Sequence, residues 1–134
     1  FSSRCEVKLD HHRQAKRVAH WQQIAISACE QCGRNRTPTI HSLHGLDSWL
    51  DATVAERKFV LHHRADNLTE QGQSPTSIAL LIGPEGGLDE GEIAAAEQAG
   101  YSSLTLGPRV LRTETAPLAA IAILQDRWGD MGSA

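Results

Sequence analysis

Two glycine-rich segments in the C-terminal half of the chain hold most of the residues that could do chemistry. The first, Leu-Ile-Gly-Pro-Glu-Gly-Gly at 81–87, places a carboxylate among glycines. The second, at 106–116, contains Arg109, Arg112 and the carboxylate of Glu114. In each segment a short apolar run ends in Gly-Pro, and a polar loop leads into a helical pattern. Because loops at the carboxyl ends of parallel strands converge in one crevice, the two segments predict one shared ligand pocket.

The first segment does not have the pattern of a phosphate-binding loop. It lacks the Lys-Ser/Thr end of a Walker loop and the G-x-G-x-x-G spacing of a dinucleotide site. The carboxylate of Glu85 suits a cationic ligand better, and S-adenosylmethionine carries both a sulfonium and an ammonium. A tight turn in which glycine supplies a positive φ is the alternative for this segment. A structural salt bridge is the alternative for the arginines and Glu114.

The elements that must position these loops alternate between helices and strands, which is typical of the α/β class. Asp89 followed by Glu92 has the pattern of a capping box, and Asp47 is a possible cap of an earlier helix. The apolar run at 77–82 is typical of a strand buried on both faces of a parallel sheet. We expect helices over 12–32, 46–52, 89–99 and 115–128, and strands over 58–62, 77–82 and 103–106.

Two of the expected helices carry informative apolar patterns. The first has Gly33 as its C-cap, and its apolar stripe consists of Val18, Trp21, Ala25, Ala28 and Cys32. The last is apolar almost all the way round between 116 and 124. Such a helix needs partners on more than one side, so it lies centrally in the fold or at a dimer interface.

Length and composition favour one globular domain without a membrane span. The chain has 134 residues, of which 40% are hydrophobic and 22% charged. No apolar run approaches the roughly 18 residues of a membrane span, and no signal peptide is visible. Three cysteines, an odd number, suggest free thiols in a reducing cytoplasm.

The charges are distributed unevenly along the chain. Residues 1–36 carry seven Lys/Arg and three Asp/Glu, which gives +4, whereas the remainder carries six and thirteen, which gives −7. Ten of the thirteen bases are Arg, the side chain suited to forked phosphate contacts. A solvated helix face is the simplest explanation of the basic segment, which also permits a nucleic-acid partner.

The pair Cys29 and Cys32, with His41 and His44 after it, invites a metal or redox hypothesis. The spacing departs from that of a zinc finger. The pair also lies at the C-terminal end of the expected helix, where the helix dipole opposes a thiolate. We therefore expect two small, partly buried thiols and no metal site. Of the neighbours His62 and His63, at most one can face a pocket, because adjacent strand residues point to opposite sides.

The two glycine-rich segments, at 81–87 and 106–116, resemble the ribosomal RNA small-subunit methyltransferase E family. Ala-Cys-Glu-Gln-Cys-Gly-Arg-Asn-Arg at 28–36 is similar to that family's Ala-x-Glu-Gln-(Ser/Cys)-x-Arg helix end. Leu-His-His-Arg-Ala at 61–65 is a looser match to a segment in which the family has His-Pro. Together the matches span nearly the whole chain. Members of this family are SPOUT-class enzymes that methylate N3 of a uridine in bacterial 16S ribosomal RNA.

The resemblance implies a SPOUT-type fold with a parallel sheet flanked by helices and a C-terminal trefoil knot. In such folds S-adenosylmethionine lies bent among three knot loops, here 61–63, 82–87 and 106–116, and is held mainly by backbone groups. The implied cofactor-binding residues are Leu61, His62, Ile82, Gly83, Pro84, Glu85, Gly87, Leu106, Gly107, Val110, Leu111, Thr115 and Ala116.

The chemistry of methyl transfer to uridine N3 suggests roles for the remaining polar residues. Arg112, with Arg109 in reserve, would stabilise negative charge on the uracil ring. Glu114 or Glu85 would take the N3 proton or orient the sulfonium. The candidate RNA-binding residues are Gln31, Arg34 and Arg36.

The family also implies a homodimer, 16S ribosomal RNA in the small ribosomal subunit as partner, and the cytoplasm as location. Its members begin with a PUA-like β-barrel RNA-binding domain, followed by a strand and a helix. We expect residues 1–134 to be the methyltransferase domain without these parts, with its cofactor loops present and its RNA affinity incomplete. A non-catalytic adenosyl-ligand or RNA-binding module of the same fold is the alternative function. A zinc-stabilised interaction domain is a more distant alternative.

Overall fold

The computed structural model describes residues 10–62 and 73–132. By their internal contacts these residues form two units, the first ending at Gly45 and the second beginning at Leu46. The predicted position of His63 lies outside the described residues. None of the described helices combines the length and apolarity that a membrane crossing requires.

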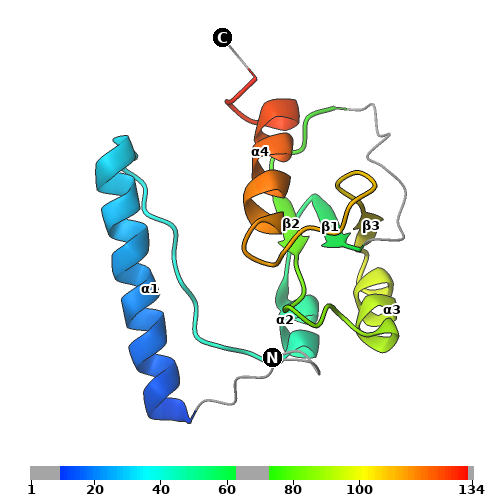
Figure 1. Ribbon diagram of the computed structural model, residues 1–134, viewed down its shortest axis with the longest axis horizontal. Helices are drawn as coiled ribbons and strands as arrows, with labels where there is room; N and C mark the ends of the chain where they lie inside the picture. The colour runs from blue at the N-terminus through cyan, green and yellow to red at the C-terminus, as the bar shows by residue number, and fades with distance from the viewer. Residues whose placement is uncertain (1–9, 63–72, 133–134) are drawn as a thin grey trace. The chain divides into compact units, whose positions relative to one another are not determined.

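The first unit consists of the long helix α1 (His11–Cys32) and the segment that follows it. An Asp10 side-chain oxygen caps the helix by accepting from the backbone N–H of Arg13 at 2.8 Å. Gly33 ends it with φ 74°, as predicted from its sequence position. The segment after α1 runs back beside the helix (Figure 1), where Gln22 donates to the Pro38 carbonyl and accepts from the Ile40 N–H.

The stripe of α1 that is covered differs from the predicted one. Val18 and Ala25 belong to it as expected, but Trp21 is 37% exposed and Cys32 is also exposed. The two hydrogen bonds of Gln22 decide this difference, because they turn the Gln22 side of the helix toward the returning segment. The covered stripe therefore consists of Gln14, Val18, Gln22, Ala25, Ile26 and Cys29, whereas Ala28 of the predicted stripe is exposed.

The second unit is built on a three-stranded parallel sheet, so the predicted α/β class with a parallel sheet flanked by helices is confirmed. The strand order is β2-β1-β3, and Phe59 pairs with Leu80 on one side and with Ser102 on the other. In chain order the elements are α2 (Leu46–Ala52), β1 (Arg57–Leu61), β2 (Ile78–Leu81), α3 (Glu90–Gln98), β3 (Ser102–Leu104) and α4 (Ala116–Trp128).

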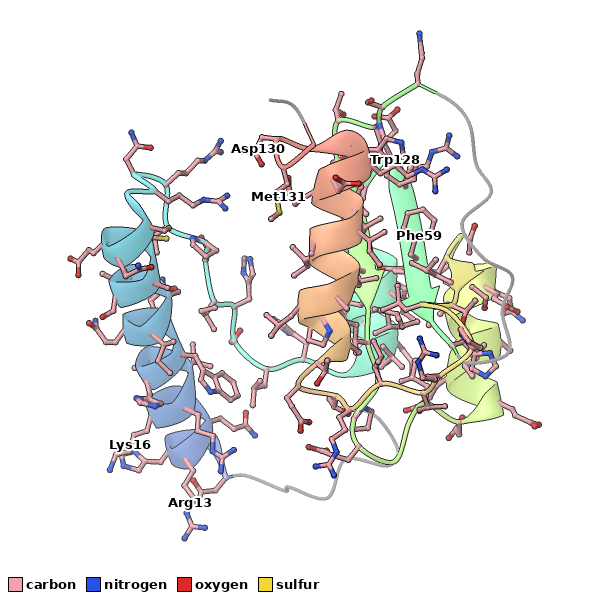
Figure 2. All side chains as sticks on the ribbon, turned by 45° about the horizontal axis from the view of Figure 1, so that its top comes forward. Arg13, Lys16, Phe59, Trp128, Asp130 and Met131 are labelled. Carbon is pink, nitrogen blue, oxygen red and sulfur yellow. The ribbon has the colours of Figure 1, made fainter. Side chains whose placement is uncertain are left out.

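The alternation of side chains along β1 divides the core of this unit into two layers. Val60 points to the face covered by α2 and α3, where it packs with Leu50, Ala96 and Tyr101. Phe59 points to the opposite face, which is covered by α4 (Figure 1). There its ring stacks on Trp128 with centroids 6.1 Å apart and planes 9° from parallel (Figure 2).

Residues close to the helix ends predicted most of these ends correctly. The capping box of α3 is present, because the Glu92 N–H donates to Asp89 at 2.8 Å and the Asp89 N–H donates to Glu92 at 2.9 Å. The prediction of Asp47 as a cap is wrong, since α2 begins at Leu46 and Asp47 lies in its first turn. The prediction that β2 is buried on both faces is also wrong. Only Leu81 of this strand is buried, because β2 lies at the edge of the sheet.

Candidate active site

A cavity of about 820 Å³ opens at the carboxyl ends of the three strands, where both glycine-rich loops meet. All three strand ends contribute to it, as expected for parallel strands. This arrangement confirms that the two segments share one pocket. The lining consists of Leu61, His62, Ile82, Gly83, Pro84, Glu85, Gly86, Gly87, Leu88, Thr105, Leu106, Arg109, Val110, Leu111, Arg112, Thr113, Glu114 and Ala116.

The loop after β2 folds tightly because its glycines permit close backbone approach. A Cβ placed on Gly83 would lie 2.9 Å from the Leu88 nitrogen, which is closer than real Cβ contacts allow. Gly87 adopts φ 71°, a left-handed conformation that favours glycine, and its N–H donates to the Pro84 carbonyl at 2.8 Å. The turn therefore presents main chain rather than bulky side chains to the cavity, as a ligand cradle requires.

The loop after β3 leads from the strand into α4 without another regular element. Gly107 has φ 80°, and its carbonyl accepts from the Thr105 hydroxyl at 3.1 Å. The Arg112 carbonyl accepts from the N–H groups of Thr115 and Ala116 at 2.9 and 2.8 Å. These bonds close the turn at 113–115 that leads into α4. The Arg112 side chain is thereby attached to backbone that both the loop and the helix hold in place.

Four charged side chains surround the mouth of the cavity, and their charges cancel in sum. Glu85 comes from the loop after β2, whereas Arg109, Arg112 and Glu114 come from the loop after β3. Nη1 of Arg112 lies 3.9 Å from Oε1 of Glu114, and these side chains are 86% and 68% exposed. An ion pair this long and exposed contributes little to folding. Both groups are therefore available to a ligand.

Most residues predicted for the pocket line it. The three candidate catalytic residues do so, and so do eleven of the thirteen candidate cofactor-binding residues. The two that do not line it are Gly107 and Thr115. The lining residues that sequence reasoning missed are Gly86, Leu88, Thr105 and Thr113, of which Gly86 and Thr113 lie inside the quoted motifs.

The three candidate RNA-binding residues lie in the first unit, at the end of α1 and just after it. Gln31, Arg34 and Arg36 are all exposed. The Arg34 side chain donates to the Arg36 carbonyl at 3.1 Å, which holds the turn that follows Gly33. Their role in RNA binding stays a prediction.

The expectation of two at least partly buried thiols is correct for Cys29 and wrong for Cys32. Cys29 is buried and Cys32 exposed, and neither forms a disulfide. The Cys32 thiol lies 3.7 Å from the Cys29 carbonyl, one helical turn away. Within the described ranges no group of three or more His, Cys, Asp or Glu side chains comes together as metal ligands would.

Residues 1–125 match a known family, the RNA methyltransferase domain. This chain belongs to that family. Among solved structures, the domain is similar to ribosomal RNA small subunit methyltransferase E from Neisseria gonorrhoeae bound to S-adenosylmethionine. The two are 46% identical, with a TM-score of 0.88, and the match covers 98% of this chain and 54% of the other. A Legionella pneumophila protein solved with bound S-adenosylmethionine matches at 40% identity and a TM-score of 0.90, over 95% and 53% of the two chains.

Curated relatives confirm the resemblance found in the motifs. Ribosomal RNA small subunit methyltransferase E from Buchnera aphidicola of Schizaphis graminum is 42% identical over 118 residues, which are 87% of this chain and 48% of the relative. The Bacillus subtilis protein of the same name is 32% identical over 135 residues, which cover 92% and 52%. The domain therefore spans about half the length of the relatives that it matches.

Proposed function

We propose that this domain transfers a methyl group from S-adenosylmethionine to N3 of a uridine in 16S ribosomal RNA. The observation that carries the proposal is the cavity at the strand ends, which both glycine-rich loops line. Relatives of the same family at 40% and 46% identity were solved with this cofactor bound. A volume of about 820 Å³ lies within the range of small-molecule sites and leaves room for a nucleobase beside the cofactor.

The residues of the cavity fit the cofactor in shape and in charge. The main chain around Gly83 and Gly87 can approach a ligand closely. Apolar side chains of Leu61, Ile82 and Leu106 offer contacts for an adenine ring. The carboxylate of Glu85 or Glu114 would balance the positive charge of the sulfonium or the ammonium. When bound, S-adenosylmethionine supplies an electrophilic methyl group on its sulfonium.

Arginine at the mouth of the cavity would stabilise the reacting base. Transfer forms the bond between N3 and the methyl carbon, breaks the sulfur–methyl bond and releases the N3 proton. Loss of this proton spreads negative charge over O2 and O4 of the ring, which a fixed guanidinium can meet. We assign this role to Arg112, because its backbone is held by the first hydrogen bonds of α4. Arg109 is the second candidate for the same role.

A carboxylate at the same mouth would accept the N3 proton. Glu114 and Glu85 both line the cavity, and Glu114 already lies within ion-pair distance of Arg112. A base must come within hydrogen-bond reach of the proton, directly or through one water. Both carboxylates stay candidates for this step.

Several broader properties belong to the same proposal. The loops at 82–87 and 106–116 would be part of a C-terminal trefoil knot of SPOUT type, and they meet at one cavity. A homodimer would cover the exposed apolar side chains of α4, which are Leu118, Ile121 and Ile123. Gln31, Arg34 and Arg36 would contact the RNA. An enzyme acting on the small ribosomal subunit would work in the cytoplasm.

Titration calorimetry with S-adenosylmethionine, followed by a methylation assay on small ribosomal subunits, tests the proposal. We expect saturable binding and incorporation of one methyl group per subunit at N3 of a uridine. Binding without transfer by a full-length relative whose methyltransferase domain has been replaced by this one would favour a non-catalytic adenosyl-binding module. Stoichiometric zinc without cofactor binding would contradict the proposal.

A further inference from the structure

The N-terminal half of α1 presents a row of basic side chains on one face. Arg13, Lys16 and His20 follow one another at steps of three and four, and Arg17 lies one turn after Arg13. All four side chains are exposed, and Figure 2 shows Arg13 and Lys16 extending outward from the first turns of the helix. We call these four residues the basic face of α1.

This face is opposite the side of the helix that packs within its own unit. Gln14, Val18 and Gln22 make up the covered stripe, and the bonds of Gln22 to the backbone at 38 and 40 hold it in place. Among the described residues, the basic face therefore lies away from the side of α1 that packs on the segment after it. In the described part of the chain, Arg13 of this face forms an ion pair with Asp10, whose side chain also caps the helix.

Positive charges at this end of α1 are unfavourable for the helix itself. The N-terminus of a helix carries partial positive charge and favours anions, yet the first turn of α1 contains no acidic residue. Between Asp10 and Glu30 the helix carries bases only. An exposed row of bases, with no acid on the helix between Asp10 and Glu30, is best explained by a partner that carries negative charge.

We propose that the basic face of α1 binds the phosphate backbone of RNA. A rise of about 1.5 Å per residue puts Arg13 and His20 about 10 Å apart along the axis. Within this length Arg13, Lys16 and Arg17 are three permanent cations on one face, which can contact neighbouring phosphates of one strand. A membrane surface fits less well, because helices that lie on bilayers bury an apolar face, whereas here the apolar stripe is already covered.

The face differs from the candidate RNA-binding residues Gln31, Arg34 and Arg36, which lie at the other end of the helix. Phosphate contacts orient a nucleic acid without reading its sequence. The binding would therefore operate even with an RNA that is not methylated. RNA binding by the basic face and the proposed methyl transfer can therefore be tested separately, and either can fail without the other.

The test measures binding of a fluorescein-labelled, single-stranded RNA of mixed sequence to the 134-residue chain at several salt concentrations. In the variant Arg13→Gln/Lys16→Gln/Arg17→Gln we expect affinity to fall about tenfold or more at low salt. The slope of log K against log salt should become shallower by about 2, because each lost phosphate contact removes about 0.7. Far-ultraviolet circular dichroism should show α1 intact, since these changes remove cations from a helix N-terminus.

Two control variants separate the face from net charge. Val54→Glu/Ser74→Glu/Ser102→Glu changes the net charge by the same amount at exposed positions of the second unit, and should keep the parent's salt slope. Arg13→Lys/Arg17→Lys keeps the charge of the face and should retain most of the affinity. Equal affinity and slope in the parent and the glutamine variant would overturn the proposal. Binding of the parent to phosphatidylglycerol vesicles but not to RNA, or to neither, would overturn it as well.

Discussion

Nη1 of Arg112 and Oε1 of Glu114 lie 3.9 Å apart at the mouth of the cavity, on the short stretch of chain that connects β3 to α4. The pair is exposed, so a ligand that enters the cavity can compete for either partner. A base with developing negative charge would bind the Arg112 guanidinium in place of Glu114. The Glu114 carboxylate would then be able to accept a proton.

Replacing Arg112 by alanine in a full-length relative with the same motif should reduce turnover about a hundredfold or more. Affinity for S-adenosylmethionine should change little, because the guanidinium would act on the base rather than on the cofactor. Steady-state kinetics at saturating cofactor, together with calorimetry, measure both quantities. If affinity collapses and turnover survives, Arg112 is a cofactor ligand and its catalytic assignment is wrong.

Replacing Gly107 by valine should abolish cofactor binding. The residue has φ 80°, a conformation that a β-branched side chain rarely adopts, so the loop around Leu106 and Arg109 must rearrange. Gly33→Val is a matched control, because Gly33 has φ 74° but ends α1 in the other unit. Calorimetry should show normal cofactor binding for the control and for Cys29→Ser. Equal losses in all three variants would contradict the assignment of the loop.

Light scattering at micromolar concentration should show a homodimer formed through α4. Leu118 is 71% exposed and Ile123 is 45% exposed on a helix that is apolar on nearly all sides. Leu118→Lys/Ile123→Lys should therefore yield a monomer. Val54→Lys is the control, since Val54 is 95% exposed and lies outside this helix. A parent chain that is already monomeric would speak against this interface.

Acid should weaken the connection between the starts of β1 and β2. The N–H and the hydroxyl of Thr76 donate to Glu56 Oε2 at 2.8 and 2.9 Å, and these bonds lower the pKa of Glu56 below its usual 4.5. A carboxyl whose pKa is lower in the folded state stabilises the fold above its unfolded pKa, and this contribution disappears as pH falls through the folded value.

The variant Glu56→Gln should therefore melt at a lower temperature than the parent at neutral pH. The gap should close as pH falls below 4.5, which thermal unfolding followed by circular dichroism would measure. Thr76→Val should remove the hydroxyl bond and part of the same effect. A gap that stays constant across this pH range would mean that the charge of Glu56 plays no part.

Features that depend on a few neighbouring residues could be predicted from the sequence. The capping box of Asp89 and Glu92 and the left-handed Gly33 were predicted correctly, because both are local in the chain. The shared pocket was also predictable. Parallel strands place their following loops at one edge of the sheet, so two motifs about twenty residues apart had to meet.

Other features depended on contacts between distant segments, and only the tertiary structure decided them. Whether Trp21 or Gln22 faces the packed side of α1 depends on hydrogen bonds to a segment sixteen and eighteen residues away. Only Leu81 of β2 is buried because the strand lies at the edge of the sheet, and the strand's own residues do not specify this position. Likewise, Thr105 lines the cavity and Gly107 does not, because the path of the loop in three dimensions, not membership of a motif, determines which residues face the cavity.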